Sequence, residues 1–123
     1  RGEEAMEGVR GFCVSEGIGA GYFSMIGAAE SVIISFYDLG EKKYNDTILE
    51  GPLEITGVTG NIAKKDGGVV LHAHGTFSDN RFSTKGGHVK EILISATGEV
   101  VLTPIRGVIE RSYDDVTGLN LMQ

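Results

Sequence analysis

The fold of this chain is decided by the stretch Val69-Val70-Leu71-His72-Ala73-His74-Gly75-Thr76-Phe77. Its side chains alternate in character and include several β-branched and aromatic residues, a pattern that predicts a β-strand. Alternate residues of a strand point to the same face. We therefore expect His72 and His74 to lie side by side on one face of a strand.

The chain has 3 histidines, and all of them lie in or shortly after this stretch. Two Cβ atoms at alternate positions of a strand are about 6.6 Å apart, so both rings can turn toward one cation. His88, which follows Gly86-Gly87, can supply a third nitrogen. Three neutral imidazoles with one open position are typical of reactive zinc sites, and imidazole also suits nickel, copper and iron. The pattern predicts one divalent transition metal on His72, His74 and His88.

The same pattern has a second interpretation. Leu71 and Ala73 can face the core while His72 and His74 lie on the solvated face of a half-exposed strand. An H-x-H pair alone is a weak signal of metal binding. The clustering of every histidine, with a glycine pair that frees the backbone before His88, favours the metal site. Both interpretations stay open at this point.

Length and charge restrict the classes of protein. A chain of 123 residues fits one domain, which we place at residues 1–123, with a core of its own. The net charge of −6 opposes binding to a phosphate backbone. The single cysteine, Cys13, cannot form an internal disulfide, so we expect a cytoplasmic protein and a packing role for this thiol. The apolar runs are shorter than the ~20 residues of a membrane helix, and what precedes Arg1 is left open.

The remaining sequence predicts one helix followed by extended segments. The apolar spacing of three and four residues predicts a helix over Glu3–Glu16, with Gly17 as its stop. Strands are predicted at Ala20–Gly27, Ser31–Tyr37, Tyr44–Glu50, Leu53–Ala63, Val69–Phe77, Val89–Ser95, Glu99–Pro104 and Val108–Tyr113, with turns that include Gly51-Pro52 and Thr97-Gly98. The fold class is therefore α+β, a mostly antiparallel sheet with one N-terminal helix packed on it.

Two glycines interrupt a predicted strand in the segment Leu53–Ala63. Gly57 and Gly60 lie inside this otherwise regular run. Glycine within a strand marks either a bulge or a place where another backbone comes close. The second possibility includes the backbone of a neighbouring subunit, and both possibilities stay open.

The order of these segments resembles the PPC family, the "plants and prokaryotes conserved" domain, in its prokaryotic single-domain form. The resemblance covers most of the chain, and its specific part is the H-x-H pair followed by G-G-H. The other carriers are the N-terminal helix and the segments Ile26-Gly27-Ala28-Ala29, Leu53–Ile62, Leu71–Gly75 with Asp79, and Ala96–Leu102. The resemblance implies an antiparallel α/β domain that assembles as a homotrimer. It also implies that His72, His74 and His88 surround a metal near a subunit boundary, with zinc as the first candidate. Glu99 then becomes either a nearby polar partner or an exposed carboxylate at a strand edge.

Three classes of function follow from this sequence. The first is a homotrimeric module that presents the metal to a small ligand or a protein. The second is a DNA-associated transcriptional regulator, as the family label suggests. The AT-hook of the plant members, with its Arg-Gly-Arg-Pro core, is absent, because the pairs Arg1-Gly2 and Arg106-Gly107 are followed by Glu3 and Val108. The third is a metal-dependent enzyme that uses a metal-bound water, with Asp79, Glu91 and Glu99 as candidate bases. The glycines of Gly17–Gly21 follow a predicted helix, whereas a dinucleotide-binding glycine loop follows a strand, so this segment does not indicate nucleotide binding.

Overall fold

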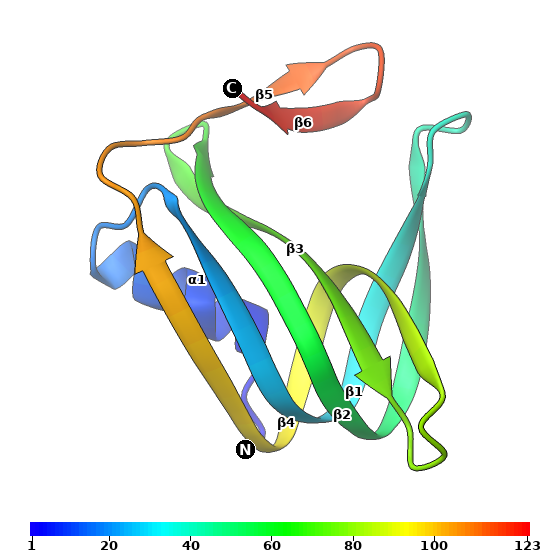
Figure 1. The fold of residues 1–123 in the computed structure, drawn as a ribbon. Coiled ribbons are helices and arrows are strands. Elements are labelled where there is room, and N and C mark those ends of the chain that lie inside the picture. Colours follow the sequence, from blue (N-terminus) through cyan, green and yellow to red (C-terminus); the bar gives the residue numbers. More distant parts are fainter.

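The computed structural model describes residues 1–123 as a closed antiparallel barrel with one helix against it (Figure 1). The elements in chain order are α1 (Ala5–Ser15), β1 (Gly21–Asp38), β2 (Lys43–Lys65), β3 (Gly68–Ser78), β4 (Thr84–Pro104), β5 (Arg111–Asp114) and β6 (Leu119–Met122). The barrel order is β1-β2-β3-β4, and β5 and β6 form a separate hairpin that lies at one end of it. The α+β description, mostly antiparallel sheet with one short helix, is confirmed. No helix has the length and apolar character needed to cross a membrane.

Three of the predicted strand boundaries are wrong, because pairs of predicted strands are continuous in the structure. The segments Ala20–Gly27 and Ser31–Tyr37 join in β1, Tyr44–Glu50 and Leu53–Ala63 join in β2, and Val89–Ser95 and Glu99–Pro104 join in β4. The predicted turn Gly51-Pro52 is a bulge, since both residues oppose the single residue Glu30 between the pairs Ser31–Glu50 and Ala29–Leu53. Thr97-Gly98 lies at a similar register shift between β1 and β4. Bulges bend a strand and raise its twist, which closes the barrel.

The last predicted strand is also misplaced. Val108–Tyr113 is a strand only from Arg111, and the chain then turns into β6, which the sequence did not predict. The turn is built by Asp114, whose carboxylate accepts hydrogen bonds from the Thr117 backbone N–H and hydroxyl, both at 2.7 Å. Gly118 completes it with a φ of +75°. A hairpin of this length is too short to show a clear periodicity in sequence.

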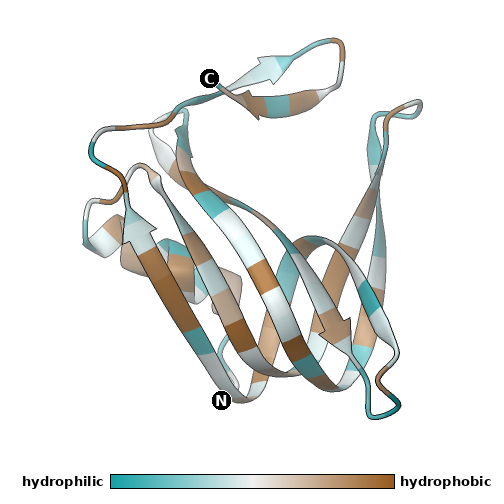
Figure 2. Ribbon diagram, in the orientation of Figure 1, coloured by the Kyte–Doolittle hydropathy of each residue, from teal (hydrophilic) through white to brown (hydrophobic).

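The core fills the barrel and the layer between the barrel and α1. Phe23, Phe77 and Met25 are its largest fully buried side chains, and the alternation of apolar and polar residues along each strand is visible in Figure 2. The helix adds Met6, Val9 and Cys13 to the same cluster. The packing role predicted for Cys13 is confirmed, since its exposure is 0%.

The two glycines that interrupt the predicted strand Leu53–Ala63 are explained by different features of β2. Gly57 lies at a register shift between β2 and β3, and a Cβ there would meet nothing within 4 Å, so it belongs to a bulge. At Gly60 a Cβ would lie 2.5 Å from the Phe23 ring and 2.9 Å from the Ala73 Cβ. Gly60 therefore makes room for a side chain of its own barrel.

Candidate metal centre

Strands β3 and β4 bring the three histidines together. His74 lies directly opposite His88 in the antiparallel ladder, and His72 is two residues away on β3. One ring nitrogen from each histidine lies within 4.8 Å of the other two. The ring centroids are 5.1 Å apart for His72–His74 and for His72–His88, and 5.6 Å apart for His74–His88. The cluster predicted from the sequence is therefore present as a geometric fact.

Local features hold the β3–β4 hairpin in the register that this cluster needs. The Asp79 carboxylate accepts the backbone N–H groups of Arg81 at 2.8 Å and Ser83 at 3.0 Å, which shapes the turn. A Cβ at Gly86 would lie 2.6 Å from the Gly75 carbonyl oxygen, and one at Gly87 would lie 2.8 Å from the Ser35 carbonyl oxygen. The glycine pair thus lets β4 pack closely between β3 and β1, and this close packing presents His88 to the other two rings.

Polar side chains from β1, β2 and β4 surround His88. The Tyr44 ring lies 4.8 Å from the His88 ring, centroid to centroid. The Asp46 carboxylate accepts hydrogen bonds from Lys90 Nζ and from Ser35 Oγ, both at 2.7 Å. These hydrogen bonds, that from Lys90 above all, hold the pKa of Asp46 below its usual value. Asp46 is therefore ionised at neutral pH and is already paired with a cation.

Arg111 reaches the cluster from the hairpin outside the barrel. Its Nη1 donates to the Asn120 carbonyl oxygen and its Nη2 donates to Asn61 Oδ1, each at 2.7 Å. The same Nη2 lies 3.5 Å from Nδ1 of His72. Sequence reasoning did not find Arg111 or Asp46. Asn61 could have been found, because the short turn Asp66-Gly67 of the β2–β3 hairpin sets it opposite His72. Nothing local connects Arg111 with the histidines.

The environment keeps two of the histidines neutral. Burial, with the nearby Arg111 and His74, lowers the pKa of His72. Burial, with the neighbouring His72 and His74, lowers the pKa of His88 to about 4. Only a neutral imidazole offers a lone pair to a metal. His88 Nδ1 is buried and has no hydrogen-bond partner, which is the kind of group that a ligand would satisfy. The donor set therefore fits a transition metal such as zinc.

The three carboxylates considered as catalytic bases are not part of this cluster. The only group of three or more potential metal-binding side chains consists of the three histidines. Asp79 is engaged in the β3–β4 turn. Glu91 and Glu99 are exposed on β4, opposite Ile33 and Ile26 of β1. Glu99 thus matches the exposed strand carboxylate, one of the two expectations for it.

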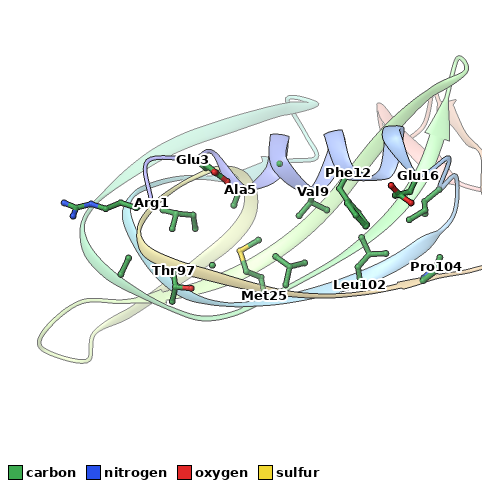
Figure 3. Close-up of a pocket in the computed structure, with 16 residues that line it drawn as sticks. Arg1, Glu3, Ala5, Val9, Phe12, Glu16, Met25, Thr97, Leu102 and Pro104 are labelled. Carbon is green, nitrogen blue, oxygen red and sulfur yellow. The ribbon is translucent and has the colours of Figure 1, made fainter.

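A separate apolar groove of about 960 Å³ lies between α1 and the β1–β4 part of the barrel (Figure 3). Val9 and Phe12 of the helix line one side, and Met25 and Leu102 line the other. None of the histidines lines it. The groove is therefore distinct from the candidate metal centre.

The chain was compared with protein families and with known proteins. The family model of the Plants and Prokaryotes Conserved (PCC) domain, abbreviated PPC above, matches residues 1–106. No curated protein matches the chain.

Three solved structures share the fold over nearly the whole chain. A metal-containing protein from Archaeoglobus fulgidus is 33% identical, with a TM-score of 0.93 over 99% of this chain and 86% of its own. A plant- and prokaryote-conserved (PPC) protein from Pyrococcus horikoshii is 30% identical, with a TM-score of 0.94 over 100% of this chain and 85% of its own. A "putative DNA binding protein" from Bacteroides thetaiotaomicron is 29% identical, with a TM-score of 0.97 over 100% of this chain and 86% of its own.

Proposed function

The chain belongs to the Plants and Prokaryotes Conserved (PCC) domain family, and we propose that it is a metal-binding module that presents a three-histidine centre to a small ligand or a partner protein. The observation that carries the proposal is the convergence of His72, His74 and His88, whose ligand nitrogens lie within 4.8 Å of one another. The Archaeoglobus relative is described as containing a metal, which supports the same reading. Zinc is the first candidate, because neutral imidazoles with an open fourth position are typical of its reactive sites.

The residues at this centre have different roles. A bound divalent metal would supply a Lewis-acidic position. His72 and His88 are held half-buried on paired strands, while His74 is exposed, so an external ligand can approach from the His74 side. Tyr44 packs against His88 and restricts its ring. The barrel thus orients the nitrogens before any metal arrives, which reduces the entropy cost of binding.

Metal analysis of protein purified without a histidine tag tests this proposal. We expect about one transition metal per chain in the wild type and loss of most of it in His72→Ala and His74→Ala, since each removes one of three ligands. Thr76→Ala is the matched control, because Thr76 lies two residues beyond His74 on the same exposed face of β3. Unchanged metal content in both histidine variants would leave these residues as an ordinary solvated face.

We also propose that the chain assembles as a homotrimer through the outer face of β1 and β4. Tyr22, Ile26 and Val101 are 53%, 56% and 69% exposed there, and Val101 lies opposite Ser24, between the other two. An apolar patch of this kind is typical of a protein interface, and C3 is an ordinary closed symmetry for heterologous contacts. The subunit contact that the glycines of Leu53–Ala63 left open would adjoin this face, since β2 pairs with β1.

Light scattering at micromolar concentration tests the assembly. A trimer has three times the 13.1 kDa mass of one chain. We expect Val101→Asp to reduce the mass to that of one chain, and Val116→Asp, at an 81% exposed position of the β5–β6 turn, to leave the trimer intact. A monomeric wild type would contradict the proposal.

DNA binding is the second candidate function, and the description of the Bacteroides relative is what favours it. The net charge of −6 opposes it, because affinity for duplex DNA depends on cations that neutralise phosphates. We therefore propose that this chain alone binds mixed-sequence duplex DNA no more tightly than ~10⁻⁴ M at physiological salt. A nanomolar mobility shift at ~150 mM salt would overturn this expectation.

A further inference from the structure

We infer that the histidine centre binds an oxyanion, a ligand with a carboxylate or phosphate group, and that Arg111 of the β5–β6 hairpin is the residue that recognises its charge. The inference rests on the proposed metal site and names the chemical class of the ligand for it. Arg111 and its neighbour Asn120 lie beyond residues 1–106, the part of the chain that the family model matches.

The first argument is the balance of charge around the cluster. Three neutral imidazoles leave the full charge of a divalent metal uncompensated. The Arg111 guanidinium adds a further positive charge, with Nη2 only 3.5 Å from Nδ1 of His72. The nearby carboxylate of Asp46 is already bonded to Lys90 at 2.7 Å, so it contributes no net negative charge. A half-buried site with this excess of positive charge favours an anion at the open metal position.

The second argument is the hydrogen-bonding capacity that the protein leaves unused. Arg111 Nε is buried and donates to no hydrogen-bond partner, whereas His88 Nδ1, also without a partner, is available to the metal. Arg111 bonds directly to Asn120 and contacts His72, whose ring is 5.1 Å from that of His88. Unsatisfied buried polar groups are rare in proteins, so the free guanidinium N–H calls for a bound acceptor. A guanidinium with a free Nε–H matches the oxygens of a carboxylate or phosphate.

The third argument is that the hairpin holds Arg111 in place. Tyr37 at the tip of the β1–β2 arm donates to the Thr117 carbonyl oxygen at 2.6 Å, and Lys42 donates to the Asp115 carbonyl oxygen. Asn61 anchors the guanidinium itself from β2. The Arg111 guanidinium is therefore fixed beside the histidines by elements on two sides. Little of its conformational entropy is lost when an anion binds there.

The experiment uses cobalt as the metal, because the visible absorption of Co²⁺ changes when a ligand enters its coordination sphere. The full chain loaded with Co²⁺ is titrated with acetate and, separately, with inorganic phosphate at neutral pH. We expect a saturable spectral change in the wild type and roughly tenfold to hundredfold weaker anion binding in Arg111→Gln, since hydrogen bonds to charged groups are lost. Arg106→Gln is the matched control, an exposed arginine before the hairpin, and should behave as wild type.

The outcomes separate this inference from the function on which it rests. Failure of the wild type to bind Co²⁺ would overturn the metal site itself. Co²⁺ binding without any anion response, or an equal response in Arg111→Gln, would overturn the role of Arg111 alone. If Arg111→Gln does not load cobalt, Arg111→Lys decides: weaker anion binding supports the inference, because the charge remains but the planar fork is lost, and unchanged affinity refutes it. A response to only one anion assigns the ligand to that group.

Discussion

Adding one methyl group at Gly60 should destabilise the barrel, whereas the same change at Gly57 should not. Both glycines lie on β2, three residues apart. In Gly60→Ala the new Cβ would lie 2.5 Å from two atoms of the Phe23 ring, and Phe23 is fully buried at 0% exposure. Carbon atoms normally stay about 3.5–4.0 Å apart, so the overlap is about 1 Å and the ring has no free space to enter.

The size of the effect can be worked from two opposing contributions. Overpacking a core by one methyl group costs about 1–3 kcal/mol. Replacing glycine by alanine restricts the unfolded chain and stabilises the folded state by about 0.4–1 kcal/mol where the conformation allows. For Gly60→Ala the net loss is therefore roughly 1–2 kcal/mol, or about 4–8 °C in Tm for a chain of this size. Gly57→Ala meets nothing within 4 Å, so only the stabilising contribution applies.

Thermal and urea unfolding followed by far-UV circular dichroism measures both variants against the wild type. The chain concentration must be equal in all samples, because association shifts the apparent stability. Light scattering on the same samples reports whether either change alters the assembly. A Gly60→Ala protein as stable as Gly57→Ala would refute the assignment of Gly60 to the Phe23 contact.

Three further predictions concern the helix, the thiol and the histidines. Glu4→Ala should cost about 1–2 kcal/mol, because the Glu4 carboxylate caps α1 and also accepts the Ile92 N–H of β4 at 2.8 Å; urea unfolding checks this, and the exposed Glu3→Ala should be near neutral. Cys13 is fully buried and burial raises its pKa, so a thiol reagent should label it only after unfolding; rapid labelling of the native protein would contradict its packing role. The pKa of His88 falls from 6.5 to about 4 on folding, so the unfolded chain binds the proton more tightly. The metal-free protein should therefore keep its full stability above pH 6.5 and lose part of it toward pH 4, and His88→Gln should flatten the dependence of the urea midpoint on pH.

The sequence by itself determined the features that depend on local pattern. The alternation across Val69–Phe77 correctly predicted β3, and the spacing of apolar residues from Glu3 to Glu16 correctly predicted α1. The same alternation put His72 and His74 on one face, and the glycine pair before His88 marked a special backbone. These properties follow from the two-residue period of a strand and the 3.6-residue period of a helix, which a sequence displays directly.

Only the tertiary structure decided where strands bend and what surrounds the histidines. Gly51-Pro52 is typical of a turn, and its role as a bulge depends on the pairing with Glu30 across the barrel. Arg111 lies 39 residues from His72 in the sequence, and the two meet because the β5–β6 hairpin folds back onto the end of the barrel. Contacts of this kind are set by register and closure between distant strands, and local periodicity carries no information about either.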